Sequence, residues 1–476
     1  MQRRDFLKLL SASGMAMMTP LSLKAGIVNT GLPAYVSGSS TLLICLHASG
    51  GWDPTLLCDP KGNASADPIN QYDPAEIATF GNISCAPTVV GVDGNGATIT
   101  GLTETFFANH YQDMMVINGI DVGTLVHQNG IERTWSGKNS RHWATLPALH
   151  AAAHAENKAL AHFWSGGYAR TDDVVNQARL QVSSNNHLAL DNLRRLIQPT
   201  LRSPNSGTGF SNRYQSDATV SRIRQAMLER LDRVQQQQTL PKLKQETGKL
   251  YAAKSSAPDL ADLESFLPSV NDYDNLTHIE RQAELTLSAF KAGVCQAADI
   301  YVGSFDTHSD NDQKQTTALG KLLVGLEYII TQAKSRGLWN RLVVMVGSDF
   351  ARTNKYNSDN GKDHWSTGSL MFTGGRIKGN RVFGLTDDTQ HAVGWDDLYP
   401  NLNWVHSGFS GPTTDFVPTM GDIHACLRRF LQISNQPLSR KGGERVKDYY
   451  PLEERIRTSF LFPTQPGPAP LQADMR

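Results

Sequence analysis

Four short, almost uninterrupted apolar runs lie far apart in the chain, over residues 41–46, 114–118, 299–305 and 342–347. Each ends in Gly, Ser, Asp or His, which is typical of a strand covered on both faces in a parallel sheet. Helical patterns over residues 282–297 and 315–336 alternate with the last two runs. This alternation predicts right-handed crossovers and an α/β fold, a three-layer sandwich around a mainly parallel, doubly wound sheet.

A polar stretch interrupts this pattern between residues 200 and 268. It opens with a Ser/Gly/Asn-rich loop and continues in a helical pattern over residues 220–238, with Ile223, Met227, Leu231 and Val234 about one turn apart. We expect an amphipathic helix packed on the main domain and interpret the stretch as a helical insertion or cap. The predicted segments are a signal (1–30), the first part of the α/β domain (31–199), the insertion (200–268), the second part (269–435) and a C-terminal tail (436–476).

The N-terminus carries an export signal. Arg3-Arg4-Asp5-Phe6-Leu7-Lys8 precedes an uncharged run that ends at Leu23, a pattern read by the twin-arginine translocon. The run is too short and too weakly apolar to span a bilayer. We therefore expect a periplasmic or secreted protein, with signal cleavage or retention left open. No later segment approaches 18 consecutive apolar residues, so we expect no transmembrane segment in the mature chain.

Composition excludes some classes of protein. The 45 basic and 45 acidic side chains give no net charge, which argues against a nucleic-acid partner bound by bulk electrostatics. The five cysteines are an odd number without a CxxC pair, so neither a zinc ribbon nor a redox dithiol is indicated.

Metal-ligand residue types follow the predicted strands. They are Asp53 after the first run, Asp306 and His308 after the third, Asp349 after the fourth, and His364 in the next loop. Ligands of doubly wound sheets bind at the carboxyl ends of the strands, where these residues would meet. Mixed Asp/His sets suit zinc or manganese, whereas calcium wants more oxygens. Singly, each has an ordinary interpretation: Asp53, for example, suits a helix N-cap.

Several motifs together resemble a known family. They are GGWD at residues 50–53, FDTH at 305–308, GSDFARTN at 347–354, GKDHW at 361–365 and GGRIKGNRVFG at 374–384. This ensemble resembles the bacterial family catalogued as domain of unknown function 1501, often exported by the twin-arginine route. By fold that family belongs to the alkaline phosphatase and sulfatase superfamily. The resemblance covers most of the mature chain and is strongest over residues 282–388.

The resemblance implies one or two divalent ions (zinc, manganese or calcium) held by Asp53, Asp306, His308, Asp349 and His364. Phe350 departs from this pattern, since many relatives have a second ligand at its position. The region that matches the superfamily's nucleophile holds Thr124 and His127, with Val126 at the apparent serine position. Thr124 and His127 are thus candidate catalytic residues, and a water nucleophile or no catalysis is equally open. Arg352 and Lys362 are the best-placed candidates for binding an anionic substrate, with surface salt bridges as their ordinary interpretation.

The leading hypothesis is an exported metal-dependent hydrolase of phosphate or sulfate esters. The alternative, motivated by Phe350 and Val126, is a non-catalytic relative that binds a glycan or a partner protein in the periplasm or at the cell surface. A single structural metal that only fastens the loops is a third hypothesis.

Overall fold

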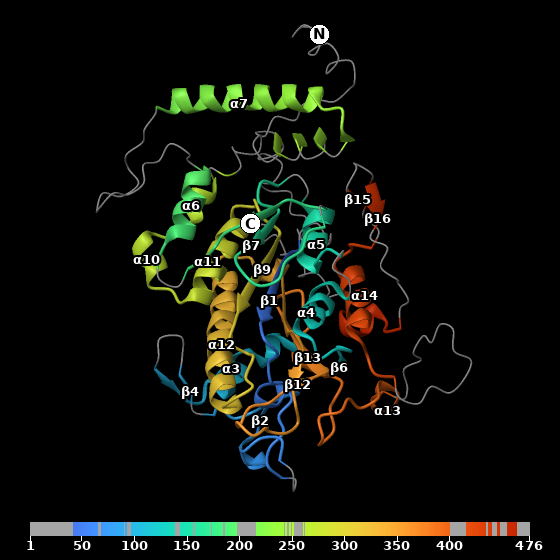
Figure 1. Cartoon of the computed structure of the whole chain (residues 1–476). Helices are drawn as coiled ribbons and strands as arrows, with labels where there is room; N and C mark the ends of the chain where they lie inside the picture. Colours follow the sequence, from blue (N-terminus) through green and yellow to red (C-terminus); the bar gives the residue numbers. More distant parts are fainter. Residues whose placement is uncertain are drawn as a thin grey trace, which may run out of the picture. The chain divides into compact units, whose positions relative to one another are not determined.

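An eight-stranded sheet forms the centre of the computed structural model, with the strand order β14-β6-β13-β10-β1-β9-β7-β8 (Figure 1). The structure describes residues 41–463 except 65–67, 90, 93–96, 139–142, 156–157, 173, 184–185, 198–215, 242, 245–246, 249, 252–259, 261, 400–415, 435–436, 440–444 and 448–454. The strands of the sheet are β1 (Leu42–Ala48), β6 (Met114–Asp121), β7 (His162–Trp164), β8 (Gln177–Arg179), β9 (Ala297–Val302), β10 (Leu342–Ser348), β13 (Thr367–Thr373) and β14 (Arg381–Phe383).

The sheet is parallel except at one strand. β1 pairs in parallel with β10 on one side and with β9 on the other. β13 runs antiparallel to both of its neighbours, β10 and β6. Successive residues of β1 point into two different cores: Leu42, Ile44 and Leu46 into one, Leu43 and Cys45 into the other.

Helices cover both faces of this sheet. The core that contains Leu42 also takes residues from α3 (Leu102–His110), α11 (His278–Lys291) and α12 (Asn311–Ser335). The core that contains Leu43 takes residues from α4 (His127–Ser136), α5 (Leu146–His154) and α14 (Met420–Phe430). The predicted fold class, a three-layer α/β sandwich with a mainly parallel sheet, is confirmed.

The remaining elements are short or lie outside the sheet. The strands are β2 (Ala78–Phe80), β3 (Ile83–Cys85), β4 (Gly91–Val92), β5 (Thr98–Ile99), β11 (Ala351–Arg352), β12 (His364–Trp365), β15 (Pro437–Ser439) and β16 (Arg445–Lys447). The α-helices are α6 (Leu188–Ile197), α7 (Asp217–Gln237), α10 (Val270–Asp274), α13 (Trp395–Leu398) and α15 (Thr458–Leu461). The 3-10 helices are η2 (Pro54–Leu56), η3 (Pro74–Glu76), η4 (Tyr111–Asp113), η5 (Asp262–Phe266) and η6 (Trp339–Arg341).

The four apolar runs correspond to β1, β6, β9 and β10, and the two helical patterns between them to α11 and α12. Sequence analysis does not anticipate β13, because Gly and Ser interrupt its apolar residues. The helix expected over residues 220–238 is α7, which begins after Ser216, whose side chain caps it. None of the four apolar residues that define its pattern is buried, and Ile223 is 54% exposed.

The predicted export signal, residues 1–30, lies outside the described residues. Within the part of the chain that the structure describes, every helix is too short or too polar to cross a bilayer.

Two fully buried histidines make the fold sensitive to acid. His150 hydrogen-bonds the carbonyl oxygen of Thr41 (2.9 Å), and His424 that of Thr134 (2.8 Å). Because a carbonyl only accepts, each ring donates its Nε2 hydrogen. Burial lowers the pKa of each ring to about 3, helped at His424 by the charge of Arg428.

We predict that the free energy of unfolding falls as the pH falls below about 6.5, the usual pKa of histidine in an unfolded chain. Between that pKa and about 3, each ring binds a proton in the unfolded chain but not in the folded chain. The free energy of unfolding therefore falls by up to about 1.4 kcal/mol per pH unit for each ring. Denaturant titrations from pH 7 to pH 5 measure this slope. His150→Gln keeps a donor for Thr41 and removes one titrating group, so its slope is shallower; an unchanged slope contradicts the prediction.

Candidate metal centre

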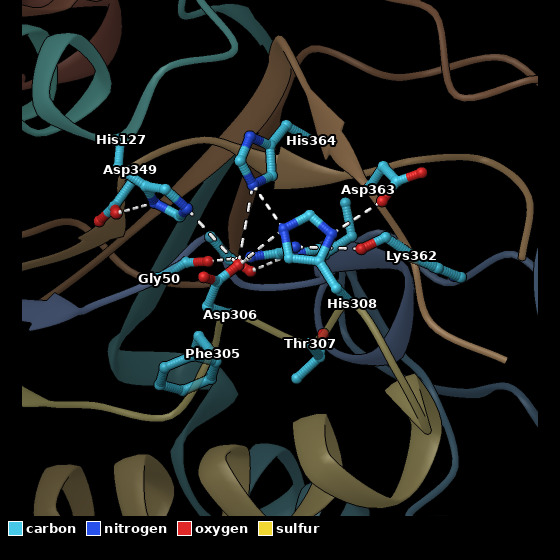
Figure 2. Close-up of polar contacts among 12 residues, drawn as sticks. Gly50, His127, Phe305, Asp306, Thr307, His308, Asp349, Lys362, Asp363 and His364 are labelled. Atoms are coloured by element: carbon cyan, nitrogen blue, oxygen red, sulfur yellow. Dashed lines mark hydrogen bonds and ion pairs between the residues drawn. The ribbon is translucent and has the colours of Figure 1, made fainter. Parts of the chain in front are cut away.

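Three side chains from distant parts of the sequence converge at the carboxyl edge of the sheet. Asp306 lies in the loop after β9, His127 is the first residue of α4, and His364 lies on β12. One ligand atom from each lies within 4.8 Å of the other two. Figure 2 shows the two imidazoles directed at the Asp306 carboxylate, with His308 of the same loop beside it. Residues about 180 and 240 positions away from His127 therefore meet it at one point.

The Asp306 carboxylate contacts all three imidazoles of this cluster. Its Oδ1 lies 3.5 Å from Nε2 of His127, 3.1 Å from Nε2 of His308 and 3.7 Å from Nε2 of His364. The Nε2 atoms of His308 and His364 are 3.0 Å apart. Ligand atoms around a tetrahedral zinc with bonds of about 2.0–2.1 Å lie roughly 3.3–3.4 Å from one another. The cluster thus has the spacing of a metal coordination shell.

Each imidazole of the cluster uses its Nδ1 atom to bond an acceptor outside it. The pairs are His127 with Asp349, His308 with Asp363, and His364 with the carbonyl oxygen of Leu125, all at 2.7 Å. A carbonyl oxygen only accepts, so Nδ1 of His364 carries the hydrogen and its Nε2 presents a lone pair. Histidines that bind metals are held in this way by a carboxylate or a carbonyl on the second nitrogen.

The cluster requires a positive charge at its centre. If His308 and His364 both carry their hydrogen on Nδ1, two lone pairs face each other across 3.0 Å, next to a carboxylate. A metal ion bound to the lone pair of His364 resolves this repulsion. Nε2 of His127 is also buried, and no hydrogen-bond partner for it exists among the described residues. A divalent ion held by His127, Asp306 and His364 would satisfy this atom and the lone pair of His364.

Asp349 lies behind His127 and orients it. Its carboxylate is buried and contacts Nδ1 of His127 (2.7 Å) and Nε2 of His47 (2.6 Å). Burial alone would raise the pKa of Asp349, but the hydrogen bonds from the two histidines lower it well below the usual value. The hydrogen bond to Asp349 in turn raises the pKa of His127. Phe350 lies under the cluster, with its ring centre 4.7 Å from that of His127 and 4.4 Å from that of His364.

Arg352 fixes the position and the charge of Asp306. Its fully buried guanidinium donates to Oδ1 of Asp306 (2.8 Å) and to the carbonyl oxygens of Gly50, Gly51 (2.8 Å) and Lys362 (3.0 Å). Burial would raise the pKa of Asp306, but Arg352 lowers it. Gly50 has φ +119°, and a Cβ atom there would lie 2.5 Å from the Asp306 nitrogen, so only glycine fits.

Asp53 and Lys362 form a separate, fully buried ion pair. Nζ of Lys362 lies 2.7 Å from Oδ2 of Asp53 and 2.7 Å from Oδ1 of Asn70. Asp53 also caps η2 by accepting from Thr55 N. Asp53 therefore has the ordinary role of a helix cap, and the Lys362 ammonium is buried in an ion pair with it. The backbone nitrogen of Lys362 donates to Thr307 O (3.0 Å), which joins the two loops that carry the cluster.

The structure brings some of the predicted site residues together and leaves others outside the cluster. Asp306, His308 and His364 come together as expected, and His127, expected as a catalytic residue, joins them with its Nε2 atom. Thr124 stands apart, with its hydroxyl oxygen accepting from Val126 N (3.1 Å). Sequence reasoning missed His47, whose only signal is a histidine inside an otherwise apolar run.

We predict that Asp349→Asn weakens metal binding by about 10- to 100-fold, because the carboxylate that orients His127 is lost. Titration of the metal-free protein with zinc or manganese measures the dissociation constant. Asp359→Asn is the matched control: that carboxylate is exposed in the loop before His364 and makes no described contact with the cluster. Equal affinities in both variants would contradict the role assigned to Asp349.

The fold and the cluster together define an α/β protein with a candidate metal centre at the carboxyl edge of its sheet. The chain belongs to the family described as protein of unknown function (DUF1501), whose profile matches residues 40–402. The family resemblance inferred from the sequence motifs is confirmed. A search of curated proteins returned no match.

The solved structures that this chain matches have low sequence identity to it. The phosphonate monoester hydrolase of Agrobacterium radiobacter has 11% identity and a TM-score of 0.33, over 90% of this chain and 78% of that one. Ps i-CgsB in complex with k-i-k-neocarrahexaose has 8% identity and a TM-score of 0.31, over 88% and 76%. A protein solved in work on glycosaminoglycan metabolism by Bacteroides thetaiotaomicron has 9% identity and a TM-score of 0.29, over 83% and 73%. Likeness at this level carries no argument about reaction or substrate.

Proposed function

We propose that the protein is an exported hydrolase of phosphate or sulfate esters that depends on one divalent metal ion. The observation that carries the proposal is the convergence of three imidazole Nε2 atoms on the Asp306 carboxylate. Such a set of nitrogen and oxygen ligands favours zinc or manganese over calcium. When bound, the ion would polarise a phosphoryl or sulfuryl oxygen and increase the acidity of a nearby water.

His127, Asp306 and His364 would hold the ion, and one side of the cluster remains accessible. The side chains of Asp306 and His308 are 52% and 47% exposed. Catalytic metal sites keep such an open position, whereas structural sites are closed by protein ligands. This exposure supports a catalytic centre over a metal that only fastens the loops.

A water molecule serves as the nucleophile in this proposal, because no described contact joins the Thr124 hydroxyl to the cluster; that hydroxyl accepts from Val126 N. His308 is the base: Asp363 fixes its Nδ1 hydrogen, so the exposed Nε2 atom can accept a proton from water. The oxygen of the water bonds to phosphorus or sulfur, and the bond to the alcohol oxygen breaks. The proton held by His308 then passes to the departing alcohol.

One ion is proposed rather than two. The charge of Asp53 is neutralised by Lys362, and Phe350 has no ligand atom at the position after Asp349. Export in folded form is supported by the Arg3-Arg4-Asp5-Phe6-Leu7-Lys8 motif, through an interaction with the twin-arginine translocon.

We predict about one divalent ion per chain in the protein purified after export, and its loss in Asp306→Ala and in His364→Ala. Mass spectrometry of the metal content measures this. Hydrolysis of aryl phosphate, sulfate and phosphonate esters falls by at least about 100-fold in both variants, because a metal-assisted step is worth several kcal/mol. Asp359→Ala retains both the metal and the activity.

Protein that neither contains nor takes up a divalent ion would sink the hydrolase proposal. Full metal content without hydrolysis of any ester would favour the second candidate, a non-catalytic protein that binds a glycan or a partner protein. Phe350 at a ligand position is the observation in its favour.

A further inference from the structure

Two cavities meet beside the Asp306 loop. The smaller, of about 630 Å³, is lined by Asp306 together with residues of α12. The larger, of about 930 Å³, lies at the end of β9 and is lined by Tyr301, by described residues between 181 and 188, and by residues 274–279 and 281. Ser304 and Lys321 line both cavities. We call the two together the Asp306 groove.

Lys321 supplies a positive charge without a described partner in this groove, whereas Arg281, which also lines the larger cavity, donates to backbone carbonyl oxygens. Lys321 is half-buried on α12, and no hydrogen bond or ion pair joins it to any of the residues that the structure describes. The other cations near the cluster are engaged: Arg352 with Asp306, Lys362 with Asp53 and, on the same helix, Lys314 with Asp310. A lysine left without a partner in the wall of a cavity suits an anionic ligand.

The larger cavity has the lining of a site for a hydroxyl-rich ligand. Its wall includes the amide and hydroxyl side chains Gln181, Ser183, Asn186, Asn275 and Thr277, with aliphatic residues such as Leu188 and Ile279 among them. The amide and hydroxyl groups donate to and accept from hydroxyls, and they offer little to a purely apolar ligand. Tyr301 adds an aromatic ring, with its centre 5.8 Å from that of His278.

The backbone of Tyr301 is fixed by hydrogen bonds, and its ring packs against a glycine. The fully buried Gln282 accepts from Tyr301 N (3.0 Å) and donates to Tyr301 O (2.9 Å). Gly166 packs against the ring so closely that a Cβ atom would lie 2.0 Å from it. Aromatic rings fixed in this way bind ligands at little entropic cost.

Ser304 marks the point where the cavities join. It is exposed and has φ +78°, a conformation that non-glycine residues rarely adopt. Such strain persists where the surrounding structure enforces it, and it concentrates at binding and catalytic sites. In the chain, Ser304 lies between Tyr301, near the end of β9, and Asp306 of the cluster. The strained residue therefore connects the wall of the larger cavity to the candidate metal centre.

We propose that the Asp306 groove binds a polyhydroxylated anionic ester, a phosphorylated or sulfated sugar. The sugar lies in the larger cavity against Tyr301, and Lys321 pairs with the anionic group. That the ester group of the ligand points toward Asp306 rests on the proposed hydrolase function. The binding itself does not require the metal. It differs from the sequence expectation, in which Arg352 and Lys362 bind the anion.

The test uses the full-length exported protein after treatment with a chelator, so that binding is measured without hydrolysis. The probes are glucose 6-phosphate, glucose 6-sulfate and glucose, titrated by ligand-observed NMR. We expect both esters to bind about 10-fold more tightly than glucose, as one charge-assisted contact implies. Lys321→Met should remove this difference, and Tyr301→Ala should weaken all three probes.

Lys334→Met is the matched control, because it removes the same charge from the same helix at a position that lines neither cavity, and it should preserve the preference for the esters. Esters that bind no better than glucose, or a Lys321→Met protein that keeps its preference, would overturn the proposal. The phosphate and sulfate arms show which oxyanion is preferred. Metal content, measured separately on untreated protein, distinguishes failure of the groove from failure of the metal centre.

Discussion

The buried guanidinium of Arg352 is the interaction on which the site depends. It joins the turn after β1, the loop after β9 and the β11–β12 pair by donating to Gly50, Gly51, Lys362 and Asp306. A buried charge is costly unless it is paired and its hydrogen bonds are satisfied, so these segments must meet for Arg352 to be stable. Because Asp306 is its carboxylate partner, the stability of the fold and the position of the central ligand have the same cause.

Charge pairing around the cluster leaves room for a divalent ion. Asp306 is paired with Arg352, and Asp53 with Lys362. Asp349 and Asp363 face histidines instead. When these imidazoles are neutral, the negative charges of Asp349 and Asp363 have no cation among their described partners to compensate them. An ion with two positive charges would balance both.

The sequence predicts those parts of the site that depend on local order. Apolar runs define β1, β6, β9 and β10, and the carboxyl ends of β9 and β10 carry Asp306 and Asp349. Asp306 and His308 have the alternating spacing expected of two side chains on one face: both are exposed, and Thr307 between them is buried.

Pairing between distant residues could not be predicted in this way. Lys362 and Asp53 are 309 positions apart, and nothing in their local sequence indicates that each neutralises the other. The same holds for Arg352. Its spacing in the sequence suggests a substrate-binding residue, whereas in the fold it is buried and donates to two glycine carbonyls. Lys321 shows the converse: its pattern is that of an ordinary helical lysine, and only the tertiary structure reveals that it has no described partner beside a cavity.

The two sides of the cluster differ in exposure, and this difference bears on where a ligand enters. On one side, His127 is fixed by Asp349 and rests on the Phe350 ring. On the other, Asp306 and His308 are about half exposed, and Asp306 borders the cavity that Lys321 lines. A ligand that approaches along α12 therefore meets the exposed carboxylate and imidazole first, while the buried side keeps its geometry. Strain at Ser304 lies on this open side, where the loop after β9 serves both the metal ligands and the groove.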